Sequence, residues 1–154
     1  MKKEKLVDKS NLGAYLLPGR IKNPNDGIYQ ASKSEELGLG TLWLSERWGN
    51  KDLGAIFGAV TQAAPSAYIA AGTTHFLTRH PIVLASMAMT LQSLSKEKFI
   101  LGIGRGVAEM FQPIGLPNIS FEYLIDCVTI HKKLCNGELV NYDGKIGKYT
   151  DMQL

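Results

Sequence analysis

The sequence predicts an α/β protein in which helices cover a parallel β-sheet, followed by a β-hairpin. Short apolar and β-branched runs alternate with longer segments whose apolar residues recur at helical spacing. The stretch Ser66–Val107 shows the alternation most clearly, because it reads as a strand, a helix and a second strand. A helix that connects two strands in this way makes them parallel members of one sheet.

The first half of the chain is expected to hold two strands and two helices. The expected elements are a strand at residues 12–17, a helix at 28–37, a strand at 41–45 and a helix at 51–64. Pro18-Gly19 ends the first strand, and Gly38 suits the left-handed position that follows a helix. The second helix has one apolar face, formed by Leu53, Ile56, Phe57 and Val60.

The second half is expected to repeat the pattern and to end in a hairpin. The expected elements are a strand at 67–74, a helix that Pro81 opens, a strand at 99–104, an irregular connection at 107–119, a helix that Ser120 caps and a hairpin at 139–149. The apolar stripes of the two helices are Leu84, Met87, Ala88, Leu91 and Leu94, and then Phe121, Leu124, Ile125 and Val128. Asp143-Gly144 is expected as the two-residue turn of the hairpin.

Four strand–helix units are too few to close an eight-stranded barrel, so they predict either a small open sheet or half a barrel. A flavodoxin-like sheet is a third alternative, although Pro18-Gly19-Arg20 is a poor phosphate-binding loop. Residues 1–11 are expected to form a flexible, polar leader, and residues 12–154 the folded domain. The last residues carry no stop signal of their own, so we expect the chain to be truncated relative to a longer ancestor.

Composition narrows the class of protein. The 154 residues are 45% hydrophobic and 20% charged, as in an ordinary globular domain, and the formal charge of +3 is too small to indicate a nucleic-acid footprint. We find no signal peptide and no apolar run long enough to cross a bilayer, so a cytoplasmic enzyme without nucleic-acid or membrane partners is expected. Cys127 and Cys135 are separated by about 12 Å along one expected helix, which predicts free thiols and no metal site.

Glycines crowd the end of the strand expected at 99–104. Gly102–Val107 reads GIGRGV, which is a poor dinucleotide-binding fingerprint because Val107 stands where that motif needs glycine or alanine. Two interpretations remain. The glycines either allow close packing of the chain or leave room for a planar ligand, and we favour the second.

Polar residues end two other strands. Gly72-Thr73-Thr74-His75 offers two hydroxyl groups and an imidazole to a ligand, although such residues also simply face water or bond a loop carbonyl. Glu46, beside Trp48, could exchange a proton with a substrate, although the residues alone favour a loop-capping role. Because ligand sites lie at the carboxyl ends of parallel strands, both strand ends are candidate sites.

Four segments carry a resemblance to a known family. They are LWLSERW at 42–48, GTTHFLTRHP at 72–81, FILGIGRG at 99–106 and LGAYLLPGR at 12–20. The first three resemble, in order and spacing, the bacterial luciferase-like family of flavin- and deazaflavin-dependent oxidoreductases. The last resembles the probable coenzyme F420-dependent subgroup. The resemblance implies a TIM-barrel type of fold, of which this chain looks like the N-terminal half of about four βα units plus a hairpin.

The resemblance also implies roles for individual residues. The ring of the cofactor would be bordered by Gly72, Thr73, Thr74, Gly104, Arg105 and Gly106. Glu46 would act as acid or base, with His75 as a second candidate. Tyr15 and Trp48 would line the substrate pocket, and no metal is implied.

The implied activity is hydride transfer, dependent on coenzyme F420, to or from a small organic substrate. A monooxygenase that uses flavin mononucleotide (FMN) is an alternative within the family, because the deazaflavin lacks the ring nitrogen on which flavin oxygen chemistry depends. A non-catalytic half-barrel that needs a partner is a second alternative. Such a half-barrel leaves strand edges unpaired, so a homodimer is one expected assembly.

Overall fold

The computed structural model describes residues 7–19, 21–49 and 51–154, and the chain divides into two compact units. The first unit runs to Gly72 and includes Leu91–Ile100, and the second consists of Thr73–Thr90 and Leu101–Leu154. Residues 1–6 of the expected leader lie outside the described residues, whereas Lys9–Asn11 form a 3₁₀ turn that Asp8 caps. None of the helices in the described part of the chain combines the length and hydropathy needed to cross a bilayer.

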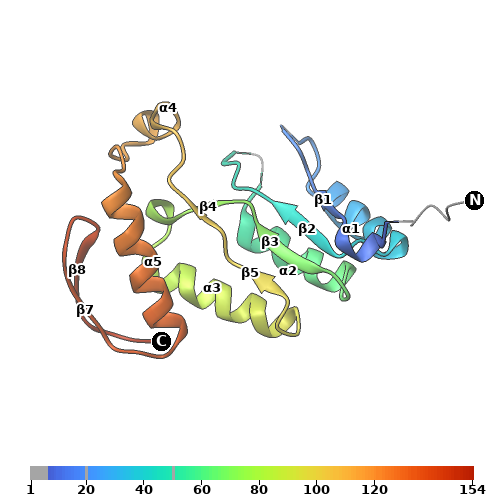
Figure 1. The fold of residues 1–154 in the computed structure, drawn as a ribbon. Helices are drawn as coiled ribbons and strands as arrows, with labels where there is room; N and C mark the ends of the chain where they lie inside the picture. Colours follow the sequence, from blue (N-terminus) through green and yellow to red (C-terminus); the bar gives the residue numbers. More distant parts are fainter. Residues whose placement is uncertain (1–6, 20, 50) are drawn as a thin grey trace, which may run out of the picture. The chain divides into compact units, whose positions relative to one another are not determined.

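A parallel sheet forms the first unit, with the strand order β1-β2-β3-β5 (Figure 1). Its strands are β1 (Gly13–Tyr15), β2 (Thr41–Leu44), β3 (Tyr68–Ala71) and β5 (Phe99–Ile100). The strands pair in register, with Tyr15 opposite Trp43 and Trp43 opposite Ala70. The carboxyl ends of β1, β2 and β3 therefore lie along one edge of the sheet.

The core of this unit lies on one face of the sheet, where α1 (Asn25–Leu37) and α2 (Leu53–Ala63) are found. Alternate strand residues and the inner faces of the helices are buried together: Leu42, Leu44, Ile69, Ala71, Ala31, Leu53, Phe57 and Val60. The apolar face expected on α2 is confirmed. The first helix begins at Asn25, three residues earlier than expected, and the Asn23 side-chain oxygen accepts a hydrogen bond from the backbone N–H of Asn25 just before it.

The two strands expected at 67–74 and 99–104 are each broken into two. Ala70 pairs with Ile100, but Thr74 pairs with Ile103, so four steps along one strand correspond to three along the other. One extra residue in one strand of a pair is the mark of a β-bulge, and a glycine without a Cβ is suited to it. Gly72 and Gly102 stand at the two breaks.

The second unit contains a short parallel pair, three helices and the hairpin. Its elements are β4 (Thr74–His75), α3 (Pro81–Leu94), β6 (Ile103–Gly104), α4 (Ala108–Phe111), α5 (Phe121–Cys135), β7 (Val140–Gly144) and β8 (Gly147–Met152). The last turn of α3, from Leu91 on, is assigned to the first unit. The connection expected to be irregular holds α4 and a 3₁₀ turn at Gln112–Ile114. On α3 the expected stripe is confirmed for Leu84, Ala88 and Leu91, whereas Leu94 is exposed in the final turn.

The apolar stripe expected on α5 is confirmed for Leu124, which packs against the core, and is wrong for Phe121 and Ile125. Phe121 and Ile125 are largely exposed, and the buried face is formed by Cys127, Ile130, His131 and Leu134. This face packs with α3 and the hairpin, which lies alongside α5 (Figure 1). Cysteine and histidine were not counted as apolar in the pattern, although both are readily buried in a core when their polar atoms allow it.

The turn of the hairpin lies at Lys145-Ile146, two residues later than expected, because Asp143-Gly144 belongs to β7. Side-chain contacts explain this register. Asp143 stands opposite Lys148, and the two side chains form an exposed ion pair of 2.6 Å. Tyr142 stands opposite Tyr149 with their rings stacked, and Ile146 packs against the core of the unit. Cross-strand pairs of this kind set the register of a hairpin.

The two cysteines are free, as expected, and Cys127 lies in the core. Burial raises the pKa of its thiol to about 12. The His131 ring donates from Nδ1 to the Cys127 carbonyl oxygen at 2.8 Å, which leaves Nε2 as an acceptor without a partner among the described residues. Burial also lowers the pKa of His131, so this core contains a neutral thiol and a neutral imidazole at pH 7.

The Cys127 thiol should make the second unit sensitive to alkali. An unfolded thiol ionises near its ordinary pKa of 9.0, whereas the folded one does so near 12, so stability falls as pH rises through this interval. The loss between pH 8 and pH 10 should be about 1.4 kcal/mol. Urea unfolding at both values should show this loss in the wild type and not in Cys127→Ala. Cys135→Ala, at a less buried thiol, is the control and should retain most of the loss.

Candidate functional site

The ends of β4 and β6 bring several predicted site residues together in the second unit. Thr74 pairs with Ile103 and His75 with Gly104, and the backbone N–H of Thr74 donates to the carbonyl of Gly102 at 2.9 Å. Thr73 lies directly before this pair and is exposed, whereas Thr74 is buried. Arg105 and Gly106 follow directly after it. Six of the predicted positions, 73–75 and 104–106, therefore form one cluster.

The glycines of this cluster are tightly enclosed by protein atoms. A Cβ on Gly104 would lie 2.2 Å from Oγ1 of Thr73. One on Gly106 would lie 2.2 Å from the ring of Phe111 and 3.3 Å from that of His75. Gly106 also has a positive φ of 71°, which disfavours other residues. The geometry agrees with the close-packing interpretation of these glycines, since side chains fill the space that a Cβ would need.

His75 is held by hydrogen bonds at both ring nitrogens. Nδ1 accepts from the backbone N–H of Leu77 at 3.2 Å, so the proton is on Nε2, which donates to the carbonyl oxygen of Arg105 at 3.1 Å. The ring is buried and stacks on Phe76, with the Phe111 ring centroid 4.0 Å away. The bond to a loop carbonyl, given above as the simpler interpretation, is thus present and positions the loop at Arg105.

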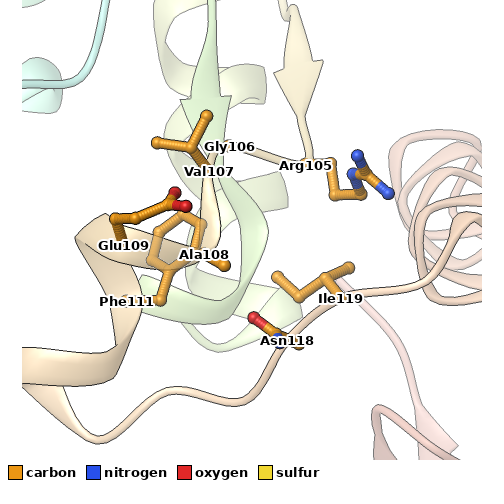
Figure 2. Close-up of a pocket in the computed structure, with 8 residues that line it drawn as sticks. All are labelled: Arg105, Gly106, Val107, Ala108, Glu109, Phe111, Asn118 and Ile119. Atoms are coloured by element: carbon orange, nitrogen blue, oxygen red, sulfur yellow. The ribbon is translucent and has the colours of Figure 1, made fainter.

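A pocket of about 420 Å³ opens beside this loop. Three stretches line it: the loop residues Arg105, Gly106 and Val107, the α4 residues Ala108, Glu109 and Phe111, and Asn118 with Ile119 before α5 (Figure 2). The guanidinium of Arg105 lies 4.7 Å from the centroid of the exposed Phe121 ring, a cation–π contact. The Arg105 guanidinium and the Asn118 carboxamide suit an anionic ligand group such as a phosphate, whereas the Glu109 carboxyl group in the same lining opposes one.

The other predicted residues lie in the first unit, near the carboxyl ends of its strands. The Tyr15 hydroxyl donates to Oγ of the buried Ser45, which ties the ends of β1 and β2 together. Glu46 follows and is buried, and its backbone carbonyl accepts from the Arg47 guanidinium at 3.1 Å. Trp48 is half-buried, and Gly72 follows directly after β3.

Lys51 is a buried residue of this edge that sequence reasoning missed. Its Nζ donates to the carbonyl of Leu17 at 2.9 Å and so connects the loops after β1 and β2. Burial lowers the pKa of the amine, with a further contribution from the Arg47 charge. Nothing in the sequence distinguishes this lysine from a surface residue before a helix.

Two aromatic side chains were also missed. Phe111 packs on Gly106 and His75, and Trp43 packs on Gly72, since a Cβ there would lie 3.1 Å from its indole. The isolated phenylalanine and the glycine-rich loop were visible in the sequence, but their pairing depends on α4, which was not expected. Among the described residues, no cluster of histidine, cysteine and carboxylate side chains could hold a metal ion.

Comparison with known families places this arrangement in a defined class of protein. Residues 8–153 match the luciferase-like monooxygenase family, and the chain belongs to that family. This finding confirms the resemblance drawn from the four sequence segments. It also accounts for the alternating βα units, which are those of a TIM-barrel type of fold.

Individual relatives include both reductases and monooxygenases. The chain is 24% identical over 127 residues to a 5,10-methylenetetrahydromethanopterin reductase of Archaeoglobus fulgidus, covering 82% of this chain and 38% of the relative. It superimposes with a TM-score of 0.77 and 21% identity on the coenzyme F420-dependent tetrahydromethanopterin reductase of Methanopyrus kandleri, covering 93% of this chain and 45% of that one. It also superimposes on the oxygenating constituent of 3,6-diketocamphane monooxygenase from Pseudomonas putida, in complex with FMN. The TM-score is 0.75 and the identity 19%, and the match covers 90% of this chain and 42% of that one.

The chain therefore spans less than half the length of each of these relatives. The expected N-terminal half-barrel agrees with this coverage. At such identities, the structural matches establish the fold.

The loss of stability caused by filling the space at Gly106 can be measured by comparison with Gly115, a glycine with a similar positive φ. Gly115 has φ of 73° with nothing within 4 Å of a built Cβ, so Gly115→Ala should cost only the left-handed strain of about 1–2 kcal/mol. Gly106→Ala adds a clash with Phe111 and should cost a further 1–3 kcal/mol or so. Urea unfolding of both variants checks this. Equal losses would contradict the packing role of Gly106.

Proposed function

We propose that this chain is part of a luciferase-like oxidoreductase that uses coenzyme F420 to transfer a hydride to or from a small organic substrate. The observation that carries the proposal is the cluster at the ends of β4 and β6, where a cationic loop residue lines a pocket of about 420 Å³. The two reductase relatives support it, since the one from Methanopyrus kandleri is named as coenzyme F420-dependent.

The residues of the cluster fit the anionic part of such a cofactor. Arg105 is exposed at the pocket, and its guanidinium can pair with phosphate oxygens in a bidentate manner. Asn118 adds a carboxamide donor to the same cavity. The Thr73 hydroxyl is exposed next to Gly104 and is available to a polar ring edge. Thr74, in contrast, is buried and pairs with Ile103 in the β4–β6 sheet. A deazaflavin, when bound, supplies a carrier for two electrons and a proton as hydride.

Glu46 is proposed as the group that gives or takes the accompanying proton. Glu46 is 8% exposed and lies two residues after the end of β2, so its carboxyl group is held near a strand end and is not a mobile surface group. Tyr15 and Trp48, from the same edge of the first unit, are proposed to contact the substrate. His75 is proposed as a positioning residue, because both of its nitrogens already bond the backbone.

A monooxygenase that uses FMN is the second candidate function. The superposition on the diketocamphane monooxygenase, whose structure contains FMN, favours it. The two functions differ in the cofactor, because only the flavin has the ring nitrogen that supports reaction with oxygen. Cofactor preference therefore separates them.

Fluorescence titration of the purified chain with coenzyme F420, and separately with FMN, tests the proposal. Saturable binding of F420 with weaker binding of FMN is the expected result. Preference for FMN would favour the monooxygenase. If a chain with native circular dichroism bound neither, these residues would not hold a cofactor ring without further protein.

A charge-removing variant tests the part assigned to Arg105. Arg105→Gln should weaken binding of the preferred cofactor by roughly tenfold or more, the worth of one charge-assisted hydrogen bond. Lys132→Gln removes one positive charge from an exposed position in the last turn of α5, away from the pocket lining, and is the control. Similar losses in both variants would show that only net charge matters and would contradict a specific contact.

A further inference from the structure

The Arg105 side chain lies against an aromatic ring that is not itself part of the pocket. Its guanidinium carbon is 4.7 Å from the centroid of the Phe121 ring and stands over the face of that ring. Arg105 lines the pocket beside α4, whereas Phe121, the first residue of α5, is not among the described residues that line it. Any influence of Phe121 on a ligand in this pocket must therefore act through Arg105.

This contact leaves the hydrogen-bonding edge of the guanidinium free for a ligand. Among the described residues, no carboxylate forms an ion pair with Arg105, and this includes Glu109 of the same pocket lining. Glu122, the neighbour of Phe121 in the sequence, is instead paired with Lys145 of the hairpin turn at 2.7 Å. An aromatic face attracts the positive charge without using the N–H donors, so the fork of Arg105 can still bond an anion.

Both partners of the contact are carried by anchored backbone. The carbonyl of Arg105 accepts a hydrogen bond from the buried His75 ring at 3.1 Å. Ile119, two residues before Phe121, is buried in the core of the second unit, and the Ser120 side chain caps the helix that Phe121 begins. A long arginine side chain loses much rotamer freedom when a ligand orders it. A ring that restricts the side chain beforehand lowers this cost, because the group is then preorganised for binding.

We propose that Phe121 is a positioning residue, which holds the Arg105 guanidinium at the pocket in readiness for the anionic group of a ligand. For the identity of that ligand, the inference rests on the proposed function, under which it is the cofactor. A cation–π contact at an exposed site changes an equilibrium constant by roughly two- to fivefold, so Phe121 should matter less than Arg105 itself.

Nuclear magnetic resonance of the ligand-free chain tests whether the ring holds the side chain. The Nε–Hε signal of Arg105, identified by its loss in Arg105→Gln, should be displaced by the ring current of Phe121. Phe121→Leu should return this signal to the position of an unstacked arginine, and Phe121→Tyr, which keeps an aromatic ring, should retain the displacement. A signal that Phe121→Leu leaves unchanged would overturn the proposal.

Titration with inorganic phosphate, followed at the backbone amide of Gly106, measures the effect on binding of an anion. Phe121→Leu should raise the dissociation constant roughly threefold, whereas Phe121→Tyr should bind phosphate as the wild type does. In the background of Arg105→Gln, Phe121→Leu should have no further effect, because the ring acts only through the guanidinium. Ile125→Ala is the matched control and should leave binding unchanged, since Ile125 is an exposed apolar residue one turn further along α5 and outside the pocket lining.

A general effect on the structure would give a different pattern. Phe121 is 68% exposed, so each variant should keep the native circular dichroism. An equal loss of binding in Ile125→Ala, or a loss that persists in the Arg105→Gln background, would overturn the proposal. So would a wild-type chain whose Gly106 amide does not respond to phosphate. If phosphate binding follows the expected pattern but neither coenzyme F420 nor FMN binds, the proposed function is wrong and the role of Phe121 toward an anionic ligand stands.

Discussion

The parallel pairing of β1, β2, β3 and β5 is the constraint on which the first unit depends. Residue-for-residue register places every second side chain on the helix-covered face, where Leu42, Leu44 and Ile69 exclude water. The same register puts the ends of the strands at one edge, where Tyr15 bonds Ser45 and Lys51 bonds the Leu17 carbonyl. It also places the alternate residues, Trp43 among them, on the other face of the sheet. The core and the strand ends are thus consequences of one register.

In the second unit, a buried imidazole links β4 to the loop that follows β6. His75 bonds the Arg105 carbonyl and packs on Phe76 and Phe111, while Phe111 fills the space beside Gly106. The loop after β6 is therefore held by the hydrogen bond from His75 of β4 and by packing against Phe111 of α4. Such support gives Arg105 a defined backbone position beside the pocket.

Sequence reasoning located most elements and the clustering of 73–75 with 104–106, because strand ends of a parallel sheet meet at one edge. It failed where long-range contacts decided the outcome. The stripe on α5 was misassigned because Cys127 and His131, rather than Phe121 and Ile125, face the core. The hairpin turn moved by two residues because the pairs Asp143–Lys148 and Tyr142–Tyr149 fix a different register. Lys51 could not be foreseen, since its buried partner is a backbone carbonyl far away in the sequence.

The sequence by itself determined the α/β class, the family and the set of residues at the strand ends, because periodicity and local motifs carry that information. Only the tertiary structure decided what those residues contact. It showed that side chains enclose Gly104 and Gly106, that both nitrogens of His75 are engaged, and that the Arg105 guanidinium lies over the ring of Phe121. Such facts depend on packing between segments that are distant along the chain, and no local pattern encodes them.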